Sequence, residues 1–216
     1  MDQMNTREKV GQLFIYTISP VQTKANMELL RSAVNTSKVG GLLFSKGETA
    51  NQVQITNKAQ EMAKIPLMIT FDGEWGLSMR LKNTPDFPRN MVLGCIEDDQ
   101  LIYEYGKEMA RQCRELGIHV NFAPVADVNI NPKNPVINTR SFGEDPNRVA
   151  DKVIAYASGL ESGGVLATPK HFPGHGDTEV DSHVGLPVLP FSRERLDSIE
   201  LNPFRKVINA GVGGMM

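Results

Sequence analysis

Several features that define other protein classes are scarce or missing in this sequence of 216 residues. It has two cysteines, Cys95 and Cys113, which lie among apolar or helical residues and are expected to be reduced, buried and inert. No apolar run approaches the length of a membrane-spanning helix. Neither sign of charge dominates, because the formal net charge is −2. The chain therefore has no general electrostatic attraction to nucleic acid or anionic membranes, and neither partner is expected.

A signal peptide is also missing from the start of the chain, where residues 1–9 are polar. The localisation expected from these residues is cytoplasmic, and an exported, periplasmic parent stays open if a signal segment has been removed. Hydrophobic residues make up 40% and charged residues 22%, which is ordinary for a globular domain.

Short apolar runs recur along the chain and predict β-strands. They do not alternate polar with apolar residues, which is typical of parallel strands covered on both faces. The six runs are residues 13–18, 40–44, 67–71, 118–122, 164–168 and 212–216.

Helical patterns lie between the apolar runs. Residues 98–116 predict an amphipathic helix, because apolar side chains recur at steps of three and four and Gly117 follows as a terminator. Asp145 before Pro146 predicts a helix N-terminus, and Asn202 with Pro203 repeats that pattern.

Strand and helix alternate throughout, which predicts an α/β fold with a parallel sheet. An open doubly wound sheet and a (β/α)8 barrel both fit this order. No glycine-rich fingerprint follows the first strand, which counts against a dinucleotide-binding unit. A barrel needs roughly 250 residues, and the chain ends inside the apolar run 212–216. We therefore predict one domain, residues 1–216, containing about the first six strands of a TIM-type barrel.

Three long irregular stretches, residues 72–90, 124–145 and 170–190, follow predicted strands. Barrels carry their active sites at the C-terminal ends of the strands, so these stretches are expected to carry the chemistry.

The segment 170–183 holds three of the four histidines. His171 and His175 have the spacing of helical zinc motifs, but a proline and two glycines accompany them and exclude a helix. A metal site built from a loop remains a minor alternative. The fourth histidine, His119, lies inside a predicted strand and is expected in the core.

Asp181 and His183 are two residues apart, so an extended backbone points both side chains the same way. A carboxylate bonded to one ring nitrogen fixes the tautomer and leaves the other nitrogen for a substrate. This pair is either a general acid/base or a hydrogen-bonded surface pair.

Taken whole, residues 170–183 resemble the K-H-F-P-G-H-G-x4-D-S-H signature of family 3 glycoside hydrolases, in the β-N-acetylglucosaminidase (β-N-acetylhexosaminidase) branch. Residues 8–14 resemble the opening helix of that family, 121–128 its fourth strand and exit, and 140–146 the loop that follows.

The resemblance implies site residues. Lys170, His171 and Arg140 would bind hydroxyls of the sugar in the subsite before the cut, and Asp72 would hold a hydroxyl on the far side of the ring. Without the family, Asp72 would be interpreted as shaping a turn and Arg140 as bracing its loop. Asp127 is assigned a structural role at the barrel rim.

The resemblance also implies that His183, paired with Asp181, is the acid/base of a retaining glycosidase that releases terminal β-linked N-acetylglucosamine. No metal or organic cofactor is required. The family nucleophile is an aspartate after the seventh strand, and none of these residues is assigned to it. The fragment itself is therefore expected to be inactive and prone to self-association.

Three alternatives to this function remain open. A β-glucosidase or β-xylosidase of the same family is one, although Asp181-Ser182-His183 argues against it. A glycoside phosphorylase and a non-catalytic sugar-binding fragment are the others.

Overall fold

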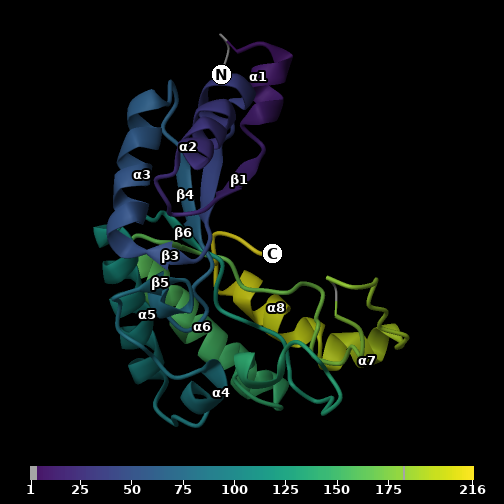
Figure 1. Cartoon of the computed structure of the whole chain (residues 1–216). Coiled ribbons are helices and arrows are strands. Elements are labelled where there is room, and N and C mark those ends of the chain that lie inside the picture. Colours follow the sequence, from purple (N-terminus) through teal and green to yellow (C-terminus); the bar gives the residue numbers. More distant parts are fainter. Residues whose placement is uncertain (1–3, 182) are drawn as a thin grey trace. The chain divides into compact units, whose positions relative to one another are not determined.

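The computed structural model describes residues 4–181 and 183–216, which divide into two compact units. The first unit comprises the residues up to Asp86 together with Gln112–Asn121. The second comprises Phe87–Arg111 and Phe122–Met216. Figure 1 shows the helices and strands of both units.

The first unit contains a parallel sheet in the order β1-β2-β4-β6, with Ile15 beside Gly41, Gly41 beside Met68 and Thr70 beside Val120. Helices α2 and α3 lie beside these strands (Figure 1). A second, two-stranded parallel sheet pairs β3 with β5. The elements are α1 (Thr6–Gly11), β1 (Ile15–Ile18), α2 (Lys24–Arg31), the π-helix η1 (Ser32–Ser37), β2 (Gly41–Phe44), β3 (Gly47–Glu48), α3 (Thr49–Met62), β4 (Met68–Phe71), the 3-10 helix η2 (Leu77–Met79), β5 (Leu81–Lys82) and β6 (Val120–Asn121).

The central strands of this sheet are buried, with Leu42, Ile69 and Phe71 fully inaccessible to solvent. Ile55 and Ala59 of α3 are buried to the same degree. Continuous apolar strands are stable only when both of their faces are covered, which explains why the predicted runs 40–44 and 67–71 became strands.

The second unit is largely helical. Helix α6 packs against α8 (Figure 1). Helix α6 also packs against the short strand β7, and α4 packs against η3. Tyr156 and Val153 of α6 and Phe204 and Val207 of α8 are buried. The elements are α4 (Asn90–Leu93), α5 (Asp99–Glu115), whose last residues belong to the first unit, the 3-10 helix η3 (Asn138–Arg140), α6 (Pro146–Ser162), β7 (Leu166–Ala167), α7 (Arg193–Ser198) and α8 (Leu201–Asn209).

The predicted helix signals have clear structural counterparts. Helix α5 falls within residues 98–116, and Ile102, Met109 and Cys113 on its apolar face are buried. The Asp145 side chain accepts from the backbone N–H groups of the first turn of α6, with Pro146 at the first position. Helix α8 differs from expectation. It begins at Leu201, so Asn202 lies inside the helix and does not cap it.

Three further expectations are corrected. Residues 212–216 are described but form no strand; Met216 makes two isolated backbone hydrogen bonds, to Pro169 O at 3.0 Å and from Phe172 N at 2.8 Å. Only Met216 of this run pairs with the backbone of residues 169–172, so no continuous ladder of hydrogen bonds forms a strand.

The other two corrections concern burial. His119 is exposed, with its Nδ1 accepting from the Ile69 backbone N–H at 2.9 Å. Cys95 is exposed, whereas Cys113 is buried as expected, and burial raises the pKa of its thiol to about 12. The position of a residue in an apolar stretch of sequence does not by itself determine whether its side chain is buried. No helix in the described part of the chain is long and apolar enough to cross a membrane.

Candidate active site

Two segments of the second unit run parallel where the predicted sugar-binding residues begin. Thr168 N donates to Ala123 O at 2.8 Å, and Lys170 N donates to Pro124 O at 3.1 Å. Ala126 N donates back to Lys170 O at 2.6 Å. This pairing continues beyond β7 and fixes the backbone of Lys170, whose residue is only 4% exposed. His171 therefore leaves a rigid strand end beside Asp127.

Asp127 is the centre of a buried polar cluster. Its Oδ2 accepts from His171 Nδ1 at 2.6 Å, and its Oδ1 accepts from the His175 backbone N–H at 2.6 Å. The His171 backbone N–H lies 3.2 and 3.3 Å from the two oxygens. Asp127 thus joins the strand exit to both ends of the turn 171–175.

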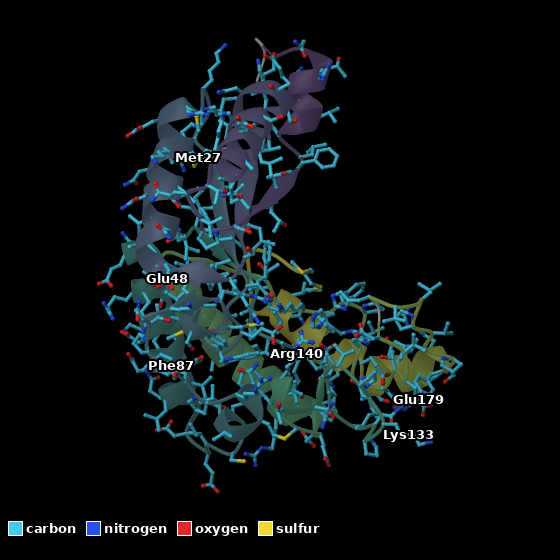
Figure 2. All side chains as sticks on the ribbon, viewed as in Figure 1. Met27, Glu48, Phe87, Lys133, Arg140 and Glu179 are labelled. Atoms are coloured by element: carbon cyan, nitrogen blue, oxygen red, sulfur yellow. The ribbon has the colours of Figure 1, made fainter. Side chains whose placement is uncertain are left out.

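Arg140 and His171 are brought together, as the resemblance implied. Arg140 Nη2 lies 3.2 Å from His171 Nε2, and Arg140 Nη1 donates to Val136 O at 3.3 Å. The backbone of Arg140 is held by Asn90, whose Nδ2 donates to Arg140 O at 2.7 Å. Arg140 is labelled in Figure 2 at the end of η3.

His175 is buried beneath this pair, with 6% of its surface exposed. Its Nδ1 is bonded to Thr178 Oγ1, and its carbonyl accepts from Asn134 Nδ2 at 2.6 Å. Its Nε2 is buried without a hydrogen-bond partner among the described residues. Burial lowers the pKa of His175, against an opposing contribution from Asp127.

The ring contacts also bear on the alternative of a metal site in this loop. Both ring nitrogens of His171 are engaged by protein groups, Nδ1 by Asp127 and Nε2 by Arg140. The His171 and His175 rings are perpendicular, with centroids 6.0 Å apart. A metal ion would have to displace Arg140 to reach His171, so this geometry does not favour the metal alternative.

The predicted acid/base pair is formed on an exposed loop. His183 Nδ1 lies 2.7 Å from Asp181 Oδ1, which also accepts from the His183 backbone N–H at 2.9 Å. These backbone and ring hydrogen bonds from His183 lower the pKa of Asp181. The His183 side chain is 83% exposed. The described residues of 172–183 form turns and bends, as predicted, and Ser182 of the D-S-H motif lies outside the described residues.

Ion pairs attach this loop to its surroundings in the second unit. Arg195 of α7 donates to Asp177 Oδ2 at 3.0 Å and to both carboxylate oxygens of Glu200 at 2.8 and 2.7 Å. Lys133 and Glu179, labelled side by side in Figure 2, approach to 3.9 Å on the surface. The Arg195 contacts are partly shielded from solvent and should hold the loop better than the exposed Lys133 pair, which water screens.

Asp72 belongs to the first unit, where it directly follows β4. Its carboxylate forms an ion pair with Arg80 Nη2, and Arg80 Nε donates to Asp72 O at 3.3 Å. The neighbouring Gly73 is held by Asn121 of β6, which accepts from Gly73 N at 2.9 Å and donates to Gly73 O at 3.1 Å. The start of this loop is therefore fixed on two sides.

Three residues that fix the predicted site residues or their loops were not predicted from the sequence. Asp127 was expected only to cap the rim, and Arg80 and Asn121 were not singled out. One signal pointed to Asp127. It directly follows the segment 123–126, and His171 directly follows the segment 168–170 that pairs with it.

The chain is similar to known proteins over nearly its whole length. A family model described as the glycosyl hydrolase family 3 N terminal domain matches residues 5–216. Beta-hexosaminidase A of Pseudoalteromonas piscicida is 39% identical over 189 residues, covering 82% of this chain and 32% of that protein. The structure of a glycoside hydrolase family 3 β-N-acetylglucosaminidase from Paenibacillus sp. str. FPU-7 is 38% identical with a TM-score of 0.90, covering 99% of this chain and 41% of that one. The structure of the beta-glucoside phosphorylase BglX, with 2FGlc bound, is 25% identical with a TM-score of 0.93, covering 100% of this chain and 38% of that one.

The fold is that of the α/β N-terminal domains of glycoside hydrolases. This chain belongs to glycoside hydrolase family 3. The predicted α/β fold with a parallel sheet is confirmed and matches the barrel-like N-terminal domain of the family. The resemblance to the β-N-acetylglucosaminidase branch is confirmed by similar proteins of that name. The chain spans only 32% of the Pseudoalteromonas relative's length.

Proposed function

We propose that the intact protein is a retaining glycosidase that releases terminal β-linked N-acetylglucosamine. His183 protonates the leaving oxygen and then activates the water that cleaves the glycosyl-enzyme. The observation that carries this proposal is the Asp181–His183 pair, in which Nδ1 is bonded to the carboxylate at 2.7 Å. This bond fixes the neutral tautomer and leaves Nε2 to exchange a proton with the substrate.

The binding part of the site is assigned to Arg140, Lys170 and His171 in the second unit and to Asp72 in the first. Nitrogen-bearing side chains and a carboxylate suit the hydroxyl groups of a sugar, which both donate and accept hydrogen bonds. The nucleophilic aspartate of the family is assigned to none of the described residues. A 216-residue chain prepared alone is therefore expected to give no turnover of an aryl β-N-acetylglucosaminide.

The test is to compare hydrolysis of aryl β-N-acetylglucosaminide, β-glucoside and β-xyloside by the intact protein. The acetylated substrate should have the highest kcat/KM, and His183→Ala should abolish most of that turnover. Val184→Ala is the matched control, because Val184 is the exposed neighbour of His183 and should leave the rate unchanged. Preference for the glucoside or xyloside would refute the proposed substrate. Sugar binding without turnover would refute the proposal that the protein is an enzyme.

A glycoside phosphorylase is the second candidate, supported by the similarity to the beta-glucoside phosphorylase structure. A neutral histidine acid/base repels a phosphate anion less than a carboxylate would. The two functions differ in their product. Assays in phosphate and in phosphate-free buffer should give the same rate and free sugar for a hydrolase, whereas a sugar 1-phosphate formed only with phosphate would identify a phosphorylase.

A further inference from the structure

Asp127 is a carboxylate in an unfavourable place, and its position calls for an explanation. Its side chain is fully buried, and burying an ionised carboxylate costs several kcal/mol unless hydrogen bonds compensate it. The compensation comes from the His171 and His175 backbone N–H groups and from His171 Nδ1.

The backbone contacts alone do not require a carboxylate. An asparagine could accept from the His175 N–H through Oδ1 and would avoid burying a charge. The contact with His171 Nδ1 is different. Oδ2 approaches this nitrogen to 2.6 Å, and an asparagine would present an N–H donor there instead.

The other side of the His171 ring fixes the direction of these bonds. Arg140 is always a donor, so His171 Nε2, at 3.2 Å from Nη2, must be the acceptor. A neutral imidazole carries its single proton on the remaining nitrogen, and Nδ1–H then donates to Asp127. Carboxylate, imidazole and guanidinium therefore form a chain in which each hydrogen bond determines the next.

We propose that Asp127 is a positioning residue that holds His171 as its Nδ1–H tautomer, so that Nε2 accepts from Arg140 and holds the guanidinium in one fixed arrangement for the sugar. This inference rests on the proposed function for the sugar contact, but not for the tautomer. Asp127 touches no reacting atom and acts entirely through His171. Its anchoring of the 171–175 turn places the ring on a rigid strand end, as an orienting partner must.

The test is Asp127→Asn in the intact protein, read by ¹⁵N–¹H correlation NMR of the histidine rings. In the wild type, the His171 signals should show protonated Nδ1 and unprotonated Nε2, with assignment by their loss in His171→Gln. In Asp127→Asn, the amide that faces Nδ1 is a donor, so the proton should move to Nε2, where it opposes Arg140. A wild-type spectrum with the Nε2–H tautomer would overturn the proposal even if the variant failed to fold.

Kinetic measurements distinguish a positioning role of Asp127 from a general loss of stability in the variant. Asp127→Asn should lower kcat/KM roughly 10- to 100-fold, by analogy with the loss of the partner that orients a metal-bound histidine, with most of the change in KM. Thr178→Val is the matched control. It removes the buried hydroxyl bonded to His175 in the same cluster but leaves Asp127, His171 and Arg140 in contact. It should keep the His171 tautomer and KM.

A double-mutant cycle completes the test. If Asp127 acts through the Arg140 contact, Asp127→Asn should cost little further kcat/KM in an Arg140→Met background. Additive losses, or an unchanged tautomer in Asp127→Asn, would overturn the proposal. Absence of glycosidase activity in the wild type would instead refute the proposed function, and the NMR result would still decide the tautomer.

Discussion

Helices α5 and α6 meet at a pair of glycines, Gly106 and Gly159, and this contact allows a worked prediction. A Cβ built on Gly159 would lie 2.2 Å from Tyr103 O and 2.9 Å from Gly106 Cα. The first distance is roughly 1 Å shorter than an ordinary van der Waals contact. Both atoms belong to backbone, so the overlap is relieved only if the helices separate.

The expected cost of Gly159→Ala is the difference between two effects. Overpacking a close contact destabilises by about 1–3 kcal/mol. Alanine is favoured over glycine inside a helix by about 1 kcal/mol. Because the overlap is with backbone atoms, the upper part of the overpacking range applies, about 2–3 kcal/mol. The net loss should therefore be about 1–2 kcal/mol, which lowers Tm by about 2–8 °C in a chain of this size.

The assay is thermal unfolding with urea titration as a second measure. Ser158→Ala is the control, because Ser158 is the exposed neighbour on the same helix and the change raises helix propensity by about 0.5 kcal/mol without a new contact. Ser158→Ala should unfold at or slightly above the wild-type temperature. A Gly159→Ala variant as stable as the wild type would show that the two helices are not held at this distance.

Three further predictions concern the site. His183→Ala should slow turnover of alkyl glycosides much more than that of nitrophenyl glycosides, whose leaving group needs no proton; equal losses would indicate a structural role. Burial holds the pKa of His175 below 6.5, so the folded state binds fewer protons than the unfolded chain and stability rises with pH. This contribution is complete above pH 6.5 and is lost below it, so Tm should fall on acidification and fall less in His175→Gln; parallel curves would refute this. Arg80→Lys should raise KM more than it lowers kcat, because Lys cannot make both contacts with Asp72; the exposed Lys82→Met is the control, and a change confined to kcat would contradict a binding role.

The strands that could be predicted were those whose sequence is apolar on both faces. Residues 40–44 and 67–71 have few alternatives to burial in a parallel sheet, and β2 and β4 fall within them. The run 212–216 carries two glycines, as 40–44 also does, yet it makes only isolated backbone bonds. Hydrophobicity alone therefore did not distinguish the runs that form strands from the run that does not.

The candidate site was predictable to a different extent. The Asp181–His183 pair was predictable because both residues lie in one short motif. For Arg140 and His171 the resemblance implied a shared subsite but not their direct contact. The partners Asp127 and Asn121 lie 44 and 48 residues from the groups they hold. Nothing in local sequence distinguishes such a partner from a residue that shapes a turn, because its role exists only through the tertiary contact.

These partners show that the candidate sugar-binding groups are held more firmly than the candidate acid/base. The candidate sugar-binding groups are fixed by second residues, His171 by Asp127 and Asp72 by Arg80, whereas His183 stands on an exposed loop. Under the proposed function the terminal sugar is the same in every substrate, so binding groups that are already fixed lose little entropy when it binds. Leaving groups differ, and the group that protonates them must adapt to each. Changes to the fixed partners should therefore appear mainly in KM and affect all substrates alike, while changes to the loop should appear mainly in kcat and depend on the leaving group.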